Sequence, residues 1–253
     1  PSSTQLALLG CESYEAVLQT FAAARRDLGE VLSAVEFVDR ESFELVTSHG
    51  VRDPLGSGSR HYVLIELAGS DEAHDSEKLE RFLEGVMEAG AVADGTIAQD
   101  ETQTAAIWSI REGVTEALSK TGAVYKYDVS IPLAELYDLV DEMRRRLEPL
   151  GAQVTGFGHL GDGNLHLNIV TPGRFDKDEA VLAQIEPYVF EWIRERRGSI
   201  SAEHGVGVMK PPFLHMSKSA PMIALMGGVK RLLDPRGILN PGKVLPPLER
   251  ALD

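Results

Sequence analysis

The pattern of apolar and polar residues divides the chain into segments with two different periods. Short apolar or alternating runs predict strands at 4–10, 32–38, 61–70, 92–98 and 124–133, with two more inside 152–172. Between them, apolar residues recur at helical spacing, which predicts helices over 14–28, 40–49, 71–90, 101–120, 133–151, 176–198 and 222–233. Ser13 is the expected N-cap of the first helix, and Gly29 its stop.

This order of elements predicts an α+β fold in which helices cover one face of a mainly antiparallel sheet. A parallel sheet is the competing arrangement. The connections "GDGN" and "GVG" lack the strand, six-residue glycine spacing and helix of a dinucleotide-binding fingerprint. A length of 253 residues is enough for one large domain or two modest ones with a buried core.

The charge balance narrows the range of partners. Asp and Glu total 39 against 25 Lys and Arg, so the net charge is −14. This disfavours nucleic acid or an anionic membrane surface as the main partner, although a local cluster of cations can still hold a small anion. The single cysteine, Cys11, excludes an intramolecular disulfide, and no apolar run reaches the roughly 18–20 residues that span a membrane.

Residues 156–169, "GFGHLGDGNLHLNI", combine glycines with two histidines. In the alternating part, His166 and Asn168 share one strand face, and the leucines lie on the other. His159 precedes His166 by seven positions, and a hairpin turn between them would bring the two imidazoles together. The pair is a candidate metal site, whereas a lone histidine is more often a hydrogen-bonded structural residue.

A second polar segment, "SAEHGVG", places Glu203 beside His204. Two histidines and one carboxylate leave open positions on a divalent metal, as a catalytic site requires, and these ligand types leave zinc, iron and manganese open. His204 could act as a proton acceptor because the unperturbed pKa of histidine is about 6.5. The alternative interpretation is a solvated Glu–His pair in a surface turn.

A third group of residues suits an anion. Arg111 and Thr115 are four positions apart on a predicted helix, and Lys126 follows in "VYKYD", where Tyr125 and Tyr127 would point the other way. A guanidinium, a hydroxyl and an ammonium together can hold a carboxylate. Alternatively, Arg111 simply pairs with a neighbouring Glu.

The remaining polar and aromatic candidates have structural interpretations. The other histidines are expected to be solvated, the arginine run to form an exposed helix face, and the tryptophans to pack in the core: His49, His61, His74, His215, Arg144, Arg145, Arg146, Trp108 and Trp192.

Three motifs in matching order, "GFGHLGDGNLHLN", "SAEHGVG" and "LLDPRGILNPGKVLP", resemble the C-terminal half of the FAD-linked 2-hydroxy-acid dehydrogenases of the vanillyl-alcohol-oxidase-type superfamily. "LGEVLSAVEF", "REGVTEALS" and "VYKYDVS" are most similar to the D-2-hydroxyglutarate branch of that family, and the D-lactate branch is the alternative. The resemblance covers nearly the whole chain. It implies a ferredoxin-like cap domain over residues 1–210 and, at 211–253, a segment that returns to an FAD-binding domain.

The resemblance also implies residue roles. It assigns zinc ligation to His159, His166 and Glu203, the catalytic base to His204, substrate contacts to Arg111, Thr115, Lys126 and Asn168, and a flavin contact to Asn240. The implied reaction removes a proton from the C2 hydroxyl and transfers a hydride from C2 to FAD. An electron-transfer flavoprotein or another acceptor would reoxidise the flavin. The family further implies a mitochondrial matrix location, or the cytoplasm in a bacterium, and a homodimer.

One feature of the family pattern has no counterpart in residues 1–253, namely the glycine-rich FAD-binding domain. We therefore expect this polypeptide alone neither to hold FAD tightly nor to act as a dehydrogenase. Two functions of other classes compete with the substrate-and-metal domain: a catalytically silent domain that binds a hydroxy acid or docks on a flavoprotein, and a metal-dependent hydrolase. The hydrolase lacks a separate carboxylate base, so it ranks last.

Overall fold

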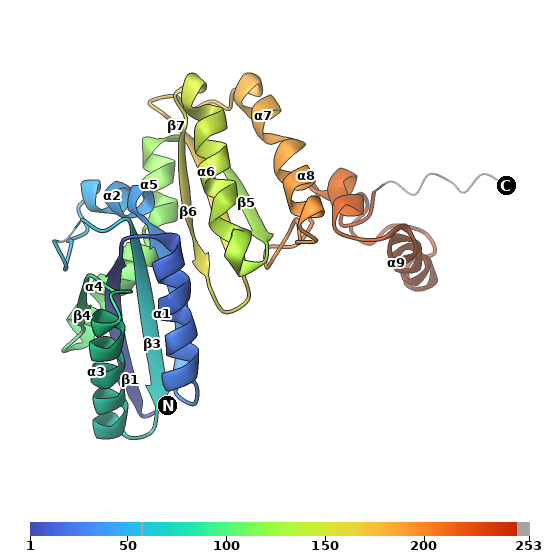
Figure 1. The fold of residues 1–253 in the computed structure, drawn as a ribbon. Coiled ribbons are helices and arrows are strands. Elements are labelled where there is room, and N and C mark those ends of the chain that lie inside the picture. The colour runs from blue at the N-terminus through green and yellow to red at the C-terminus, as the bar shows by residue number, and fades with distance from the viewer. Residues whose placement is uncertain (57, 247–253) are drawn as a thin grey trace.

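The computed structural model describes residues 1–56 and 58–246 and is built on one seven-stranded sheet (Figure 1). The strand order is β4-β1-β3-β2-β6-β7-β5, and the neighbouring strands pair antiparallel. The strands are β1 (Ser3–Cys11), β2 (Leu32–Asp39), β3 (His61–Gly69), β4 (Asp94–Ile97), β5 (Gly122–Ser130), β6 (Gln153–His159) and β7 (Asn164–Pro172). The predicted antiparallel sheet is confirmed, and the parallel alternative is wrong.

The helices follow the apolar periodicity with two differences. Their bounds are α1 (Tyr14–Asp27), α2 (Arg40–Ser48), α3 (Glu72–Glu88), α4 (Glu101–Glu112), α5 (Val114–Thr121), α6 (Leu136–Leu147), α7 (Glu179–Ile185), α8 (Tyr188–Glu195) and α9 (Ala220–Leu233). Ser13 caps α1 as predicted, accepting from the Ala16 N–H. The single helices predicted at 101–120 and 176–198 each divide, at Gly113 and before Pro187. Proline lacks the N–H that would continue a helix.

The first half of the chain forms a ferredoxin-like unit. The order β1-α1-β2-β3-α3-β4, with α2 inserted after β2, and the spatial order β4-β1-β3-β2 are those of the βαββαβ motif. The second half adds β6, β7 and β5 through the pairing of β2 with β6. This pairing places His159, at the end of β6, opposite Glu36 of β2, which lies 123 residues earlier in the chain.

Helices lie on both faces of the sheet, so the expectation that they cover only one face is wrong. Apolar residues of α1, α3, α6, α7 and α8 join one core cluster, and those of α2, α4 and α5 join another. Within β1 the two clusters take alternate residues: Ala7 and Leu9 belong to the first, Leu6 and Leu8 to the second. Such continuous apolar runs are typical of strands buried on both sides.

Two predicted surface residues are instead buried or paired. His61 is 5% exposed on β3, with its ring against that of Tyr137. Arg144 turns back from α6 to the fully buried carboxylate of Asp39, 2.5 Å from its Nη2. Both predictions were wrong because the partners, Tyr137 and Asp39, are distant in the sequence, and a local pattern of residues does not show such contacts.

The C-terminal part of the chain projects beside the sheet rather than packing over it (Figure 1). Helix α9 exposes a series of large apolar side chains, including Leu225, Leu232 and Leu233. Residues 247–253 of the predicted 211–253 segment lie outside the described residues. No helix within the described residues is long and apolar enough to cross a membrane.

Candidate functional site

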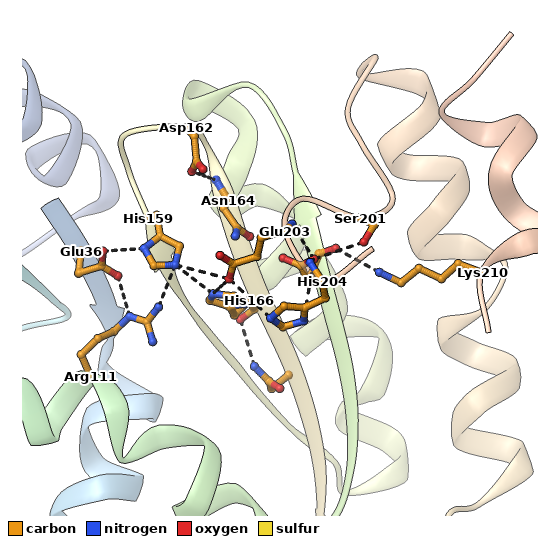
Figure 2. Close-up of polar contacts among 12 residues, drawn as sticks. Glu36, Arg111, His159, Asp162, Asn164, His166, Ser201, Glu203, His204 and Lys210 are labelled. Atoms are coloured by element: carbon orange, nitrogen blue, oxygen red, sulfur yellow. Dashed lines mark hydrogen bonds and ion pairs between the residues drawn. The ribbon is translucent and has the colours of Figure 1, made fainter. Parts of the chain in front are cut away.

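The turn between β6 and β7 brings the two histidines together, as predicted. His159 ends β6, and His166 lies on β7 with its side chain on the face opposite Leu165 and Leu167. The Nε2 atoms of His159 and His166 are 3.4 Å apart (Figure 2). Gly163 has φ +70° in this turn, and a Cβ there would lie 2.8 Å from the Ile131 carbonyl oxygen. The glycine therefore permits both the left-handed backbone and the close approach.

Glu203 completes a three-donor set with these histidines. Its Oε1 lies 3.2 Å from His166 Nε2 and 3.7 Å from His159 Nε2, and Figure 2 shows the three side chains converging. A tetrahedral zinc holds nitrogen and oxygen donors at about 2.0–2.1 Å, so its donors lie about 3.3–3.4 Å from one another. The donor types and their spacing therefore fit a zinc-type site.

Glu36 of β2 supports this set and was missed by the sequence analysis. Its Oε1 lies 2.6 Å from His159 Nδ1, and its Oε2 accepts from Arg111 Nε at 2.8 Å. The hydrogen bond to Glu36 is the main reason why the pKa of His159 is raised. It leaves the Nε2 lone pair towards His166 Nε2 and Arg111 Nη2, each 3.4 Å away. The available signal was a lone carboxylate inside the apolar run "AVEFV".

His166 is held in the neutral form. Its pKa is lowered to about 3, chiefly by burial and then by the charges of Arg111 and His159. A neutral imidazole keeps a lone pair for a metal, so burial suits His166 to ligation rather than to proton transfer.

Asp128 of β5 is the second carboxylate that the sequence analysis missed. It faces His166 across the β5–β7 pairing, and its Oδ2 accepts from the backbone N–H groups of Glu203 at 3.0 Å and His204 at 2.8 Å. Although burial alone would raise the pKa of Asp128, these hydrogen bonds bring it below its ordinary range. The signal available was alternation in "VYKYDVS", which puts Asp128 on the face of Lys126.

Glu203 and His204 lie in an exposed turn, as the alternative interpretation predicted, but the side chains of this turn contact His159 and His166. Their side chains are 48% and 63% exposed, and the rings of His166 and His204 are stacked with centroids 5.5 Å apart. Asp128, His166, Glu203 and His204 also offer ligand atoms that all lie within 4.8 Å of one another. The group of residues that could bind a metal therefore extends from His159 to Asp128 on β5.

The predicted anion group lines the same cavity, whose volume is about 380 Å³. Arg111 stacks on the Phe157 ring at 4.6 Å, so its pairing with Glu36 and its place in the site coexist. Lys126 is exposed on β5, opposite Asn168 of β7. Of the predicted site residues, these lie together: Arg111, Thr115, Lys126, His159, His166, Asn168, Glu203 and His204.

Asn240 does not join this cavity. It lies on the C-terminal segment with φ +47°, and its Oδ1 accepts from Lys243 Nζ. Its flavin contact stays a prediction.

With the geometry established, comparison with known proteins identifies the family. Residues 1–244 match the model of the FAD linked oxidases, C-terminal domain. The chain belongs to that family. The resemblance noted from the three motifs is confirmed, including its D-2-hydroxyglutarate branch.

Curated members of the FAD-linked oxidase family share about half of the residues. An Arabidopsis thaliana protein named "D-2-hydroxyglutarate dehydrogenase, mitochondrial" is 55% identical over 97% of this chain and 44% of its own length. The Danio rerio protein of the same name is 49% identical over 97% and 46%. A Schizosaccharomyces pombe protein with a provisional D-lactate dehydrogenase name is 47% identical over 96% and 48%. The chain therefore spans less than half the length of these relatives.

Solved structures agree with the fold. p-Cresol methylhydroxylase with substrate bound superposes with a TM-score of 0.67 at 12% identity, over 97% of this chain and 53% of that one. Alkyldihydroxyacetonephosphate synthase gives 0.59 at 12% identity, over 95% and 45%. At these identities the likeness concerns the fold alone.

Proposed function

We propose that this chain is the substrate- and metal-binding part of an FAD-dependent D-2-hydroxy-acid dehydrogenase that oxidises D-2-hydroxyglutarate to 2-oxoglutarate. The observation that carries the proposal is the convergence of three metal-type donors, a third histidine, His204, and two cationic side chains in one cavity. Relatives named for this activity support the choice of substrate.

The charge balance of the cavity supports a resident cation. Among the described residues, Arg111 and Lys126 are the basic side chains that line it, apart from the histidines, whereas Asp128 and Glu203 line it and Glu36 adjoins it. Two cations against three carboxylates repel an anionic substrate. A divalent metal on His159, His166 and Glu203 would make the net charge of the cavity positive. The residues therefore fit zinc, and an anionic substrate would need the metal in order to bind.

Each side chain then has a role in the reaction. His159, His166 and Glu203 would hold zinc, which would supply a Lewis acid at the C2 hydroxyl, and FAD would supply the hydride acceptor. His204, the most exposed of the three site histidines, takes the hydroxyl proton. Arg111 and Lys126 bind the carboxylates, while Thr115 and Asn168 orient the chain between them.

Metal analysis tests the ligand assignment directly. The chain purified with zinc should hold about one equivalent, and His166→Ala should lose it, because His166 supplies the most buried donor. His215→Ala is the control, since His215 is exposed and outside the cavity. Absence of zinc from the wild-type chain under metal-replete conditions would remove the ligand assignment.

Turnover of the complete flavoenzyme tests the base. His204→Ala should retain zinc and substrate binding yet lower kcat by about 10²- to 10⁴-fold, the usual contribution of a general base. Its control is His49→Ala, since His49 is the exposed C-cap of α2 and does not line this cavity. A kcat near wild type would assign the proton transfer to another group.

The D-lactate alternative has its own discriminating residue. D-2-hydroxyglutarate carries two carboxylates and needs both Arg111 and Lys126, whereas lactate needs one cation. Lys126→Met should raise the KM for D-2-hydroxyglutarate at least tenfold and leave the KM for D-lactate within about twofold, as expected for loss of one charge-assisted hydrogen bond. Equal effects on both substrates would contradict the two-carboxylate assignment.

The proposal extends to the rest of the protein. An FAD-binding region like that implied by the family would pack on residues 211–253, whose exposed leucines on α9 suit such a contact, and Asn240 would approach the flavin. An electron-transfer flavoprotein or a similar acceptor, a homodimer and a mitochondrial matrix location complete the proposal. The relatives named mitochondrial support the location.

A further inference from the structure

We propose that Asp128 is a positioning residue that holds Glu203 and His204 over the cavity by binding the backbone of their loop. The inference builds on the proposed function, because those two side chains are the ones assigned to metal binding and proton transfer. Asp128 acts through them and is assigned no contact with substrate.

Burial of side chains contributes little to holding this loop. Glu203 and His204 are 48% and 63% exposed, so burial of their side chains does not hold the turn. Asp128, by contrast, is 3% exposed and lies on β5, at the edge of the sheet. One oxygen of this rigid carboxylate accepts both loop N–H groups, at 3.0 and 2.8 Å.

Other contacts hold the ends of the loop and close its turn. At one end, Ser130 and Ser199 exchange backbone hydrogen bonds at the edge of β5. At the other, buried Lys210 donates to the carbonyl oxygens of Asp128 and Ile200. Between these two anchors, Ser201 Oγ donates to the Gly205 carbonyl oxygen at 2.8 Å, and the Ala202 N–H donates to the Asp128 carbonyl oxygen at 3.3 Å. The N–H groups of Glu203 and His204 themselves are bound by Asp128 Oδ2.

A competing role for Asp128 is direct metal ligation, since it belongs to the cluster of four potential ligands. Its Oδ1 is buried and has no hydrogen-bond partner among the described residues. The two roles differ in their response to asparagine. An amide oxygen still accepts backbone N–H groups, whereas replacing a carboxylate ligand by an amide weakens zinc binding.

Hydrogen exchange of the metal-free chain, measured by mass spectrometry, reports how strongly the loop amides are protected when no metal is bound. Asp128→Ala should accelerate exchange at least tenfold in peptides covering 200–207, and Asp128→Asn should stay within about threefold of wild type, because amide protection follows the hydrogen bond. Asp75→Ala is the control, since Asp75 is another buried carboxylate, on α3 and outside the cavity. Should Asp128→Ala fail to fold, Asp128→Ser, whose shorter side chain cannot reach both N–H groups, replaces it.

Zinc affinity, measured by competition with a chelator, tests how the position of the loop affects metal binding. Asp128→Ala should weaken zinc binding about 10- to 100-fold, the usual effect of losing an outer-shell partner. In a Glu203→Ala background the same change should cost less than threefold, because Asp128 acts through Glu203. Asp128→Asn should rescue affinity to within about threefold of wild type.

The outcomes separate this inference from the proposed function. A wild-type chain that binds no zinc refutes the metal site, yet the exchange data still decide whether Asp128 holds the loop. Unchanged exchange in Asp128→Ala overturns the positioning role. Loss of zinc affinity in Asp128→Asn equal to that in Asp128→Ala, with normal exchange, would make Asp128 a ligand instead.

Discussion

Replacing Glu36 by glutamine removes one charge and one acceptor from the point where His159 and Arg111 meet. The carboxylate faces two donors, His159 Nδ1 at 2.6 Å and Arg111 Nε at 2.8 Å. Glutamine has a single carbonyl oxygen, so its NH₂ group must face one of them. If it faces His159, it forces the proton to Nε2 and blocks the lone pair; if it faces Arg111, two donors oppose each other.

The structure sets the size of the effect. The side chains of Glu36 and Arg111 are 6% and 12% exposed, so water cannot replace the lost acceptor well. A buried donor left unsatisfied costs about 1–3 kcal/mol, and removing one partner of a buried ion pair costs about 3–5 kcal/mol. Because glutamine keeps one hydrogen bond, we expect Glu36→Gln to lower the free energy of unfolding by about 2–3 kcal/mol.

Zinc affinity should fall as well, by about 10- to 100-fold, since His159 loses the partner that fixes its tautomer. Urea unfolding and chelator competition measure the two quantities separately. Glu66→Gln is the matched control: Glu66 lies on neighbouring β3 and accepts from Trp108 Nε1 at 3.1 Å, away from the histidines. Wild-type zinc affinity in Glu36→Gln would refute the reasoning even if the protein were destabilised.

Two further predictions concern stability. The pKa of His61 is lowered to about 4, first by burial, so protons bind the unfolded chain more tightly and stability is lost as pH falls from 6.5 towards 4. His61→Phe also removes a buried Nδ1 that has no partner among the described residues. Between pH 7 and pH 5, the free energy of unfolding of His61→Phe should rise by about 2 kcal/mol relative to that of the wild type, measured by urea unfolding at both pH values. An identical pH response of the two proteins would contradict the buried neutral imidazole. Gly158→Ala puts a Cβ 2.1 Å from the Asn164 carbonyl oxygen, and overpacking of this kind costs about 1–3 kcal/mol and should displace His159 from the zinc site, whereas Gly161→Ala in open space should change neither stability nor zinc affinity.

The local features of this protein follow from its sequence alone. A strand turns successive side chains to opposite faces, so "NLHLNIV" places His166 and Asn168 together and the leucines in the core without any knowledge of the fold. The same periodicity located the strands and most of the helices, and the residue type of Ser13 predicted the cap of α1. Where one residue interrupts the pattern, as Gly113 does, the helix divides in a way that periodicity alone did not show.

The partners of the site residues were decided only by the tertiary structure. Any of 39 acidic side chains could have paired with Arg111, and the choice of Glu36, 75 positions earlier, follows from the pairing of β2 with β6 and the packing of α4 on the sheet. Asp128 likewise reaches the 203–204 loop because that loop returns to the edge strand β5. Backbone geometry sets which residues share a face, but only the order of the strands brings residues distant in the chain within hydrogen-bonding distance.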